Sequence, residues 1–358
     1  MKYRIILILC VCLLAVPVRA AEIPQELQSA LPRGAAELLE GVDPHGPDGF
    51  SAGIGQILDF MGDCFGGILR RQIRGAAAIL MAVILCAAAE NLYQGAGGKT
   101  PLFLSMAGAL SVALLTAGDL ESLIGLGTET IGQLTLFGKV LLPTLAAATA
   151  VSGAVTTAAF QQVSTVFLVN LLLQLIDGVL MPMVYLYIGM LTAAVCTGEA
   201  RLHAIAEGLK KLLSWVLSTA LLLFTLYLSV VRVISGAVDG VAVKVAKTAI
   251  SGVVPVVGGI IADAAETVLA GAGLLKSSVG IFGMLGILAA CALPFLRLGV
   301  QYLLYKLAAF LSAAVGSQTL CKLIDGLGGA FGLVLGMTGA CALLLLVSVL
   351  SAVAVVMP

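Results

Sequence analysis

Three polar residues, Asn170, Gln174 and Asp177, lie inside a long apolar run. Their spacings of four and three residues place them on one face of a helix. Polar side chains are costly in lipid and usually face a bundle interior or a water-filled path. The stripe therefore predicts a hydrated conduit or a seam on which a partner docks. Ordinary hydrogen bonding between helices, with Asp177 at the membrane edge, is the simpler alternative and the one we favour.

Patterns that would support catalysis are weak. The segment Gly95 to Thr100 resembles the end of a phosphate-binding loop, but Tyr93 occupies the position where that motif needs a glycine. The histidines His45 and His203 are far apart in the sequence, and the eight cysteines show no metal-ligand spacing. We therefore expect neither an enzyme nor a bound cofactor or metal.

A glycine repeat marks the C-terminal apolar run, where Gly328, Gly332 and Gly336 recur every four residues. Small residues at this spacing let two helix backbones approach closely. Packing within one bundle is the interpretation we favour, and an oligomer or partner interface is the alternative.

The segment Gly236 to Gly280 is neither a regular span nor a soluble loop. Its charged and helix-breaking positions are Lys244, Lys247, Pro255, Gly258, Gly259, Asp263 and Glu266. They predict two amphipathic helices around a Pro/Gly break, lying in the membrane interface or dipping into it as a re-entrant hairpin. Re-entrant backbone needs protein or water to satisfy its polar groups, and such elements are typical of pores and transporters.

The elements that must position these residues are membrane helices. Of the 358 residues, 60% are hydrophobic and 11% are charged, whereas soluble domains carry about 25% charged residues. The 19 basic and 19 acidic residues balance, so nothing indicates a nucleic-acid partner. A span needs about 20 mostly apolar residues. The sequence therefore predicts an all-α, polytopic protein in the lipid bilayer, with amphipathic or re-entrant helices besides its spans.

About eight spans are expected from the apolar runs. The run Val163 to Thr197 is too long for one span, and Asp177-Gly178 and Pro182 predict that it forms two helices or a broken pair. The other predicted spans are Gly75–Ala89, Leu102–Ala117, Val140–Ala159 (after an amphipathic stretch, Glu121–Phe137), Leu212–Ser235, Val279–Leu296, Gln301–Val315 and Phe331–Met357.

The N-terminus has the pattern of a secretory signal. Lys2 and Arg4 precede an apolar core, and small residues near Ala20 predict cleavage there, with an uncleaved anchor as the alternative. The predicted organisation is residues 1–21 as signal peptide, 22–74 as a polar extracytoplasmic region, and 75–358 as a polytopic membrane domain. Short amphipathic helices are expected on the membrane face at Leu27–Leu39 and Ile54–Leu69.

Sidedness follows from basic residues near the spans. Gly198 to Lys211 is predicted to be a loop between spans, and its residues Arg201, Lys210 and Lys211 place it in the cytoplasm. The cluster Arg70, Arg71 and Arg74 fits this orientation poorly if the signal is removed, so the direction of the first crossing stays open.

The segment Lys244 to Val268, centred on Pro255 and continuing to Lys276, resembles the stage III sporulation protein AE family of endospore-forming bacteria. Leu141-Leu142-Pro143-Thr144 and the stretch Leu209 to Trp215 resemble the same family. The resemblance extends from Gly75 to Pro358 and defines no catalytic residue.

This resemblance implies a multi-pass subunit in the mother-cell membrane around the forespore. Its implied partners are other membrane subunits and a separate ATPase subunit of a stage III sporulation A-type complex. That channel-like or secretion-like complex would link mother cell and forespore and support development after engulfment. A homo-oligomer is compatible with it. A secondary transporter of a small solute and a passive membrane scaffold remain alternatives.

Overall fold

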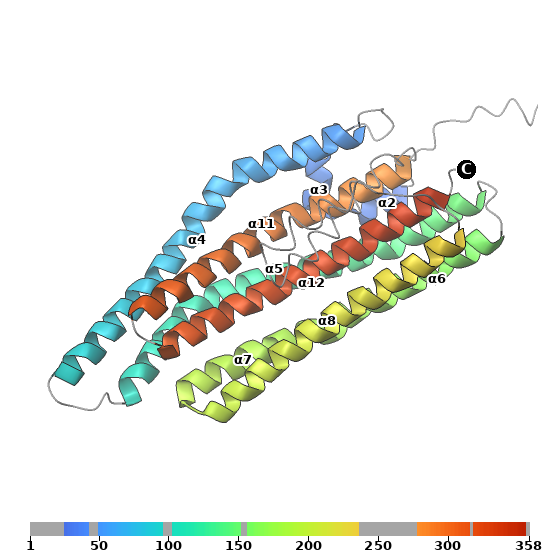
Figure 1. Cartoon of the computed structure of the whole chain (residues 1–358). Coiled ribbons are helices and arrows are strands. Elements are labelled where there is room, and N and C mark those ends of the chain that lie inside the picture. The colour runs from blue at the N-terminus through green and yellow to red at the C-terminus, as the bar shows by residue number, and fades with distance from the viewer. Residues whose placement is uncertain are drawn as a thin grey trace, which may run out of the picture.

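The computed structural model of the chain describes residues 25–42, 49–95, 102–151, 156–235, 278–315 and 318–355. All elements in these ranges are helical, and the long ones lie side by side in an elongated bundle (Figure 1). The elements are α2 (Gln25–Ala30), α3 (Arg33–Leu38), α4 (Gly49–Gly95), α5 (Leu102–Val151), α6 (Thr156–Leu175), the π-helix η1 (Ile176–Leu180), α7 (Met181–Thr197), α8 (Ala200–Ser235), α11 (Ser278–Val315) and α12 (Gln318–Val355).

The predicted all-helical fold is confirmed for the described ranges, but the expected number of spans is not. Six helical stretches in these ranges are long and apolar enough to cross a membrane. They are Gly49–Tyr93, Met106–Leu145, Val163–Thr197, Ala200–Leu228, Val279–Val315 and Thr319–Ser351. The difference arises because several apolar runs that we separated belong to one continuous helix.

Apolar runs that were predicted as separate spans share one helix in two places. The runs Leu102–Ala117 and Val140–Ala159 were expected to be separate, yet α5 continues through the amphipathic stretch between them and past Pro143 to Val151, and residues 156–159 of the second run belong to α6. The runs Val279–Leu296 and Gln301–Val315 likewise form the single helix α11, with Pro294 inside it. Charged residues interrupt hydropathy but do not interrupt backbone hydrogen bonds, so a polar stretch is weak evidence for a helix end.

The first long helix also differs from expectation. The segment Ile54–Leu69 is not a separate surface helix but the first part of α4, which continues through Arg70, Arg71 and Arg74. The helix therefore crosses position 74/75, where we divided the polar region from the membrane domain. The arginines lie partway along a rod rather than in a loop between spans, so they carry no direct information on sidedness.

The run Val163–Thr197 stays helical throughout, but its hydrogen-bond pattern changes in the middle. The helices α6 and α7 are joined by η1, whose five residues include Asp177 and Gly178. Pro182 lies in the first turn of α7, where its missing N–H is tolerated. The predicted irregularity therefore lies at the expected place. It is a π-helical turn that joins α6 and α7 directly, and not a separation into two helices. A π-helical turn inserts extra backbone into an α-helix and is frequent at functional sites.

The basic segment that we placed in a loop is also helical. Gly198 ends α7 in the left-handed conformation, with a φ of 70°, which glycine adopts without steric cost. The next helix, α8, begins at Ala200, so Arg201, Lys210 and Lys211 lie in its first turns. The predicted span Leu212–Ser235 is therefore the later part of a longer helix.

The short N-terminal helices pack on the bundle, and their predicted position on the membrane face stays a prediction. Leu27 and Ala35 are buried, and α2 contacts α5 while α3 contacts α11. The Leu31 side chain reaches Gly286 of α11, where a Cβ atom would lie 2.6 Å from the Leu31 Cδ1 atom. The apolar side of the predicted amphipathic stretch Leu27–Leu39 is thus used for contacts within the chain.

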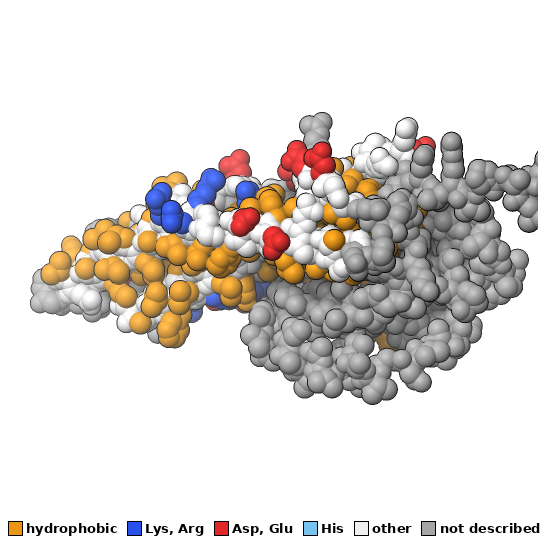
Figure 2. Space-filling view, turned by 90° about the horizontal axis from the view of Figure 1, so that it is seen from above, with side chains coloured by type: hydrophobic (Ala, Val, Ile, Leu, Met, Phe, Trp, Pro, Cys, Tyr) orange, Lys and Arg blue, Asp and Glu red, His pale blue; other side chains and the backbone are white. Residues whose placement is uncertain are grey.

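The centre of the bundle is occupied by α12. In its most apolar part 94% of residues are buried within the chain, against 22% for α8. The helices α5, α6, α7, α8 and α11 all contact it. By contrast, hydrophobic side chains dominate the outer surface of the view in Figure 2, where charged side chains gather in a short band partway along the molecule. This distribution suits a bundle whose outer helices face lipid.

Candidate functional site: polar groups among the membrane helices

The predicted polar stripe lies on α6 and η1, and its three members have different surroundings. Asn170 is partly buried, and its Oδ1 atom has no hydrogen-bond partner among the described residues. Gln174 is exposed on the outer side of α6. Asp177 is partly buried and lies close enough to Cys341 of α12 to act electrostatically on its thiol. The stripe therefore does not line one enclosed face: it runs from the bundle interior to its surface and back.

The exposed position of Gln174 is notable because its neighbours on the same side of α6 are large and apolar. Val163, Phe167 and Leu171 are 62%, 70% and 51% exposed. A side-chain amide in such a surface is costly in lipid, so a partner or a hydrated path remains a reasonable hypothesis for this side. Asn170, in contrast, is partly buried, and its Oδ1 atom bonds to no described residue, so that atom gives no support to the alternative of hydrogen bonding between helices.

Two glycines of the predicted repeat, Gly328 and Gly332, face α11 of the same chain. A Cβ atom on Gly328 would lie 3.1 Å from Tyr305 Cβ, and one on Gly332 would lie 2.9 Å from Tyr302 Cε2. Gly336 is buried farther along α12. These contacts place Gly328 and Gly332 at a close helix–helix approach inside the bundle. An interface between these glycines and a second chain stays a prediction.

The remaining predicted site lies outside the described residues. Lys244, Lys247, Pro255, Gly258, Gly259, Asp263 and Glu266 all belong to it. The amphipathic or re-entrant segment therefore stays a prediction.

A polar cluster that the sequence analysis missed joins α4, α5 and α11. The Gln301 Nε2 atom donates a hydrogen bond to Asp119 Oδ2 at 2.9 Å. The Tyr305 hydroxyl, one turn farther along α11, lies near both groups and is influenced by both. Gly75 of α4 closes one side, since a Cβ atom there would lie 3.2 Å from Asp119 Oδ2. Asp119 and Gln301 each lie at the edge of a predicted span. No pattern in the sequence around either residue indicates the hydrogen bond between them.

A second missed cluster lies near the turn that joins α11 and α12. Lys306 Nζ donates to Asp325 Oδ1 at 2.6 Å, and both side chains are partly exposed. The Tyr187 hydroxyl of α7 donates to the Gly326 carbonyl oxygen at 2.9 Å. Lys210 of α8 passes over Gly329, where a Cβ atom would lie 2.9 Å from its Nζ atom. Hydrogen bonds therefore tie α7, α11 and α12 together at this end, and the Lys210 side chain brings α8 close to them. The only sequence signal for this feature was charge within apolar runs.

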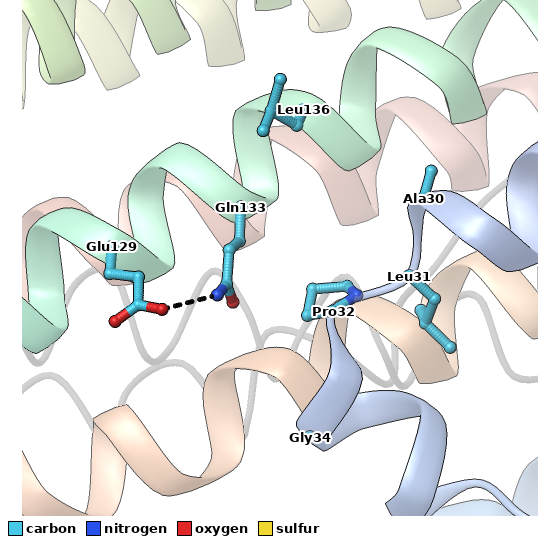
Figure 3. Close-up of a pocket in the computed structure, with 7 residues that line it drawn as sticks. All are labelled: Ala30, Leu31, Pro32, Gly34, Glu129, Gln133 and Leu136. Atoms are coloured by element: carbon cyan, nitrogen blue, oxygen red, sulfur yellow. Dashed lines mark hydrogen bonds between the residues drawn. The ribbon is translucent and has the colours of Figure 1, made fainter.

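A hollow of about 530 Å³ separates the α2–α3 turn from α5. Its lining residues are Ala30, Leu31, Pro32, Gly34, Glu129, Gln133 and Leu136. Figure 3 shows Glu129 and Gln133 on the side of α5 that faces Pro32, joined by a hydrogen bond of 3.1 Å. Because the carboxylate in the hollow is already bonded to its neighbour, we interpret the hollow as the seam on which the N-terminal helices pack.

Among the described residues, no group of three or more His, Cys, Asp and Glu side chains could hold a metal ion. The described cysteines are free thiols, with Cys86, Cys291 and Cys341 buried in the core. Cysteine acts here as a small hydrophobic side chain.

Comparison with known proteins gives a family. The model of the family described as Stage III sporulation protein AE matches residues 48–356. A curated relative, Stage III sporulation protein AE of Bacillus subtilis (strain 168), is 28% identical over 212 residues, which is 59% of this chain. The alignment covers 53% of that relative, so the chain spans about half its length. No solved structure matches the chain. Since the family match includes every described helix from α4 to α12, the chain belongs to the Stage III sporulation protein AE family.

Proposed function

We propose that this chain is the membrane subunit of a sporulation-specific complex, channel-like or secretion-like, that links mother cell and forespore. In this role it supports forespore development after engulfment. The family match over residues 48–356 carries the proposal, because it covers the whole bundle rather than one motif. Other membrane subunits and an ATPase subunit are the proposed partners, and the lipid bilayer is the solvent of the helices.

The packing of the bundle bears on where a conduit would run. A pore through one chain would follow the bundle axis, but α12 fills that axis with buried apolar side chains such as Phe331, Val334 and Leu345. Protein interiors of this kind are close-packed and leave no continuous path for water. We therefore infer that a conduit would lie between copies of this chain or between this chain and its partners.

The alternation of the six long helices supports a definite sidedness. The C-terminal ends of α4, α7 and α11 lie toward one end of the bundle, and the N-terminal end of α4 and the C-terminal end of α12 lie toward the other (Figure 1). Basic residues near the first of these ends include Arg201, Lys211 and Lys322. By the positive-inside rule we assign this end to the mother-cell cytoplasm and the opposite end to the space between the two membranes.

Deletion of the gene in its native host tests the proposed role. We expect forespores to complete engulfment and then to stop developing, and a plasmid copy of the gene to restore them. Deletion mutants that form normal spores would refute the sporulation assignment.

A second measurement separates a complex subunit from the alternative, a secondary transporter. A subunit should co-purify with its partner proteins from sporulating membranes, and the purified chain alone should support no solute flux in vesicles. Flux by the purified chain, together with purification free of partners, would favour the transporter. A passive scaffold would co-purify but tolerate apolar replacement of the polar stripe.

A further inference from the structure

The Asp119 carboxylate stands among the bundle helices, and no described side chain forms an ion pair with it. It lies within a stretch of α5 apolar enough to span a membrane, and Gln301 gives it a neutral hydrogen bond. Among the described residues the ion pair is Lys306–Asp325, and Asp119 takes part in none. A carboxylate in a low-dielectric setting is costly unless a cation or proton compensates its charge.

Two neighbouring oxygen atoms lack a well-formed hydrogen bond. Gln301 and Tyr305 are both fully buried. The Gln301 Oε1 atom has no hydrogen-bond partner among the described residues, and the Tyr305 hydroxyl interacts with Gln301 and Asp119 without a hydrogen bond of good geometry. The two side chains are four residues apart on α11, so they share one helical face, and Asp119 acts on both of them. Buried polar atoms are nearly always satisfied, so these two indicate a further group bound between them.

We propose that Asp119, Gln301 and Tyr305 form a binding site for one monovalent cation of the sodium type. The three side chains offer oxygen ligands, which hard cations prefer. Their single negative charge balances one positive charge, whereas a divalent ion would leave an excess that is expensive away from water. The proposal concerns ion binding and does not depend on the role in sporulation.

The surroundings make the site rigid on one side and accessible on the other. The Tyr305 ring packs edge-on against Phe331 of α12, with centroids 5.0 Å apart and planes at 73°, which fixes the direction of its hydroxyl. The close approach of Gly75 brings the α4 backbone against the carboxylate. Asp119 itself is only partly buried, so an ion can reach its carboxylate from the surface of α5.

An arginine is the competing source of positive charge. Arg71 and Arg74 are exposed on α4, near Gly75 in the sequence. If either side chain turned inward to pair with Asp119, the site would need no ion. The two arrangements differ in one measurable respect, because only ion binding makes stability depend on the concentration of sodium.

Thermal unfolding of the full-length chain in lipid nanodiscs tests the proposal, with the buried cysteines as reporters of unfolding through a thiol-reactive dye. Sodium chloride is varied against N-methyl-D-glucamine chloride at constant ionic strength. We expect the midpoint temperature to rise with sodium and to saturate. Asp119→Asn should abolish the rise, and Tyr305→Phe should shift the half-saturating sodium concentration upward by about tenfold, the value of one good ligand.

Two matched controls lie on the same helices. Glu121→Gln removes an exposed carboxylate two residues from Asp119, and Tyr302→Phe removes a hydroxyl three residues from Tyr305; both should keep the sodium response. If Asp119→Asn fails to fold, the binding of radiolabelled sodium in the same nanodiscs provides the test. In that measurement Tyr305→Phe should bind sodium more weakly than Tyr302→Phe. The proposal is overturned if the wild-type midpoint ignores sodium, or if Asp119→Asn or Tyr305→Phe responds as the wild type does.

Discussion

At the scale of single residues, glycine sets how closely the helices approach. Gly127 of α5 faces Val334 of α12, and Gly286 of α11 faces both Leu31 and Phe137. Helices in lipid gain little from the hydrophobic effect, so their association relies on dispersion contacts that need close backbones. The glycines outside the predicted repeat are therefore as important to the packing as those within it.

Gly127→Ala should lower stability markedly. An added Cβ atom would overlap the Val334 Cγ1 atom. The valine side chain is short and branched and belongs to the central helix, so it has little room to move. Overpacking of this kind costs about 1–3 kcal/mol. We expect a lower midpoint of thermal unfolding in detergent. Gly125→Ala is the control, because a Cβ atom at Gly125 meets no atom within 4 Å. Equal midpoints for the two variants would contradict the packing described for α5 and α12.

At the scale of elements, the sequence predicted helices well and their ends poorly. Hydropathy marked the apolar runs, but α5 continues through Glu121 and Glu129, and α11 continues through Arg297. A charged residue changes how a helix partitions into lipid, whereas only backbone constraints end it. Where a true backbone signal existed, at Gly198, the predicted boundary and the observed end of α7 agree.

The irregularity at Asp177-Gly178 was visible in the sequence, but its form was not. A weak helix former followed by a proline four residues later predicts a disturbance. Whether that disturbance is a break or a π-helical turn depends on the packing of α6 and α7 against the rest of the bundle, which local sequence does not contain. The structure keeps one rod and places Asn170, Gln174 and Asp177 at different depths.

These different depths allow the stripe to be dissected. If the stripe forms a conduit or a docking seam, replacing Asn170, Gln174 and Asp177 together by leucine should abolish forespore development while the protein level in the membrane is kept. Gln174→Leu alone should reproduce the loss if the exposed side carries the function, because Gln174 is the exposed member. Asn170→Leu alone should do so if the interior carries it.

The controls for this series lie on the same exposed side of α6. Phe167→Leu and Leu171→Met change shape but not polarity, and both should leave development unchanged. Full development of the triple variant at normal protein level would support ordinary hydrogen bonding between helices and remove the stripe as a functional site.

At the scale of the whole molecule, the main features that the sequence could not supply are contacts between distant segments. Asp119 and Gln301 are 182 residues apart, and Tyr187 and Gly326 are 139 residues apart. Each of these residues reads locally as an isolated polar group near an apolar run. Without the order in which the helices surround α12, no spacing rule pairs them.

The length of the helices also belongs to this scale. The 50 residues of α5 extend about 75 Å at 1.5 Å per residue, whereas the hydrocarbon core is about 30 Å thick. The long helices therefore project beyond the bilayer.

The proposed sidedness leads to a prediction for labelling in intact cells. Single cysteines are introduced into a cysteine-free variant at Ala52, near the start of α4, or at Thr197, at the end of α7; both residues are exposed. With one end of the bundle outside the cytoplasm, Ala52→Cys should react with a membrane-impermeant maleimide in intact protoplasts. Thr197→Cys should react only after the membrane is permeabilised.

This result would follow from the antiparallel order of the helices, because α4 starts at the end opposite to the α7–α8 connection (Figure 1). The basic residues Arg201 and Lys211 would then lie on the cytoplasmic side, as the distribution of charge favours. Labelling of both positions from the same side would mean that the bundle does not cross the membrane as a whole. Labelling in the reverse order would instead keep the crossing and turn the molecule over, leaving the N-terminal helices and their contacts with α5 in the cytoplasm.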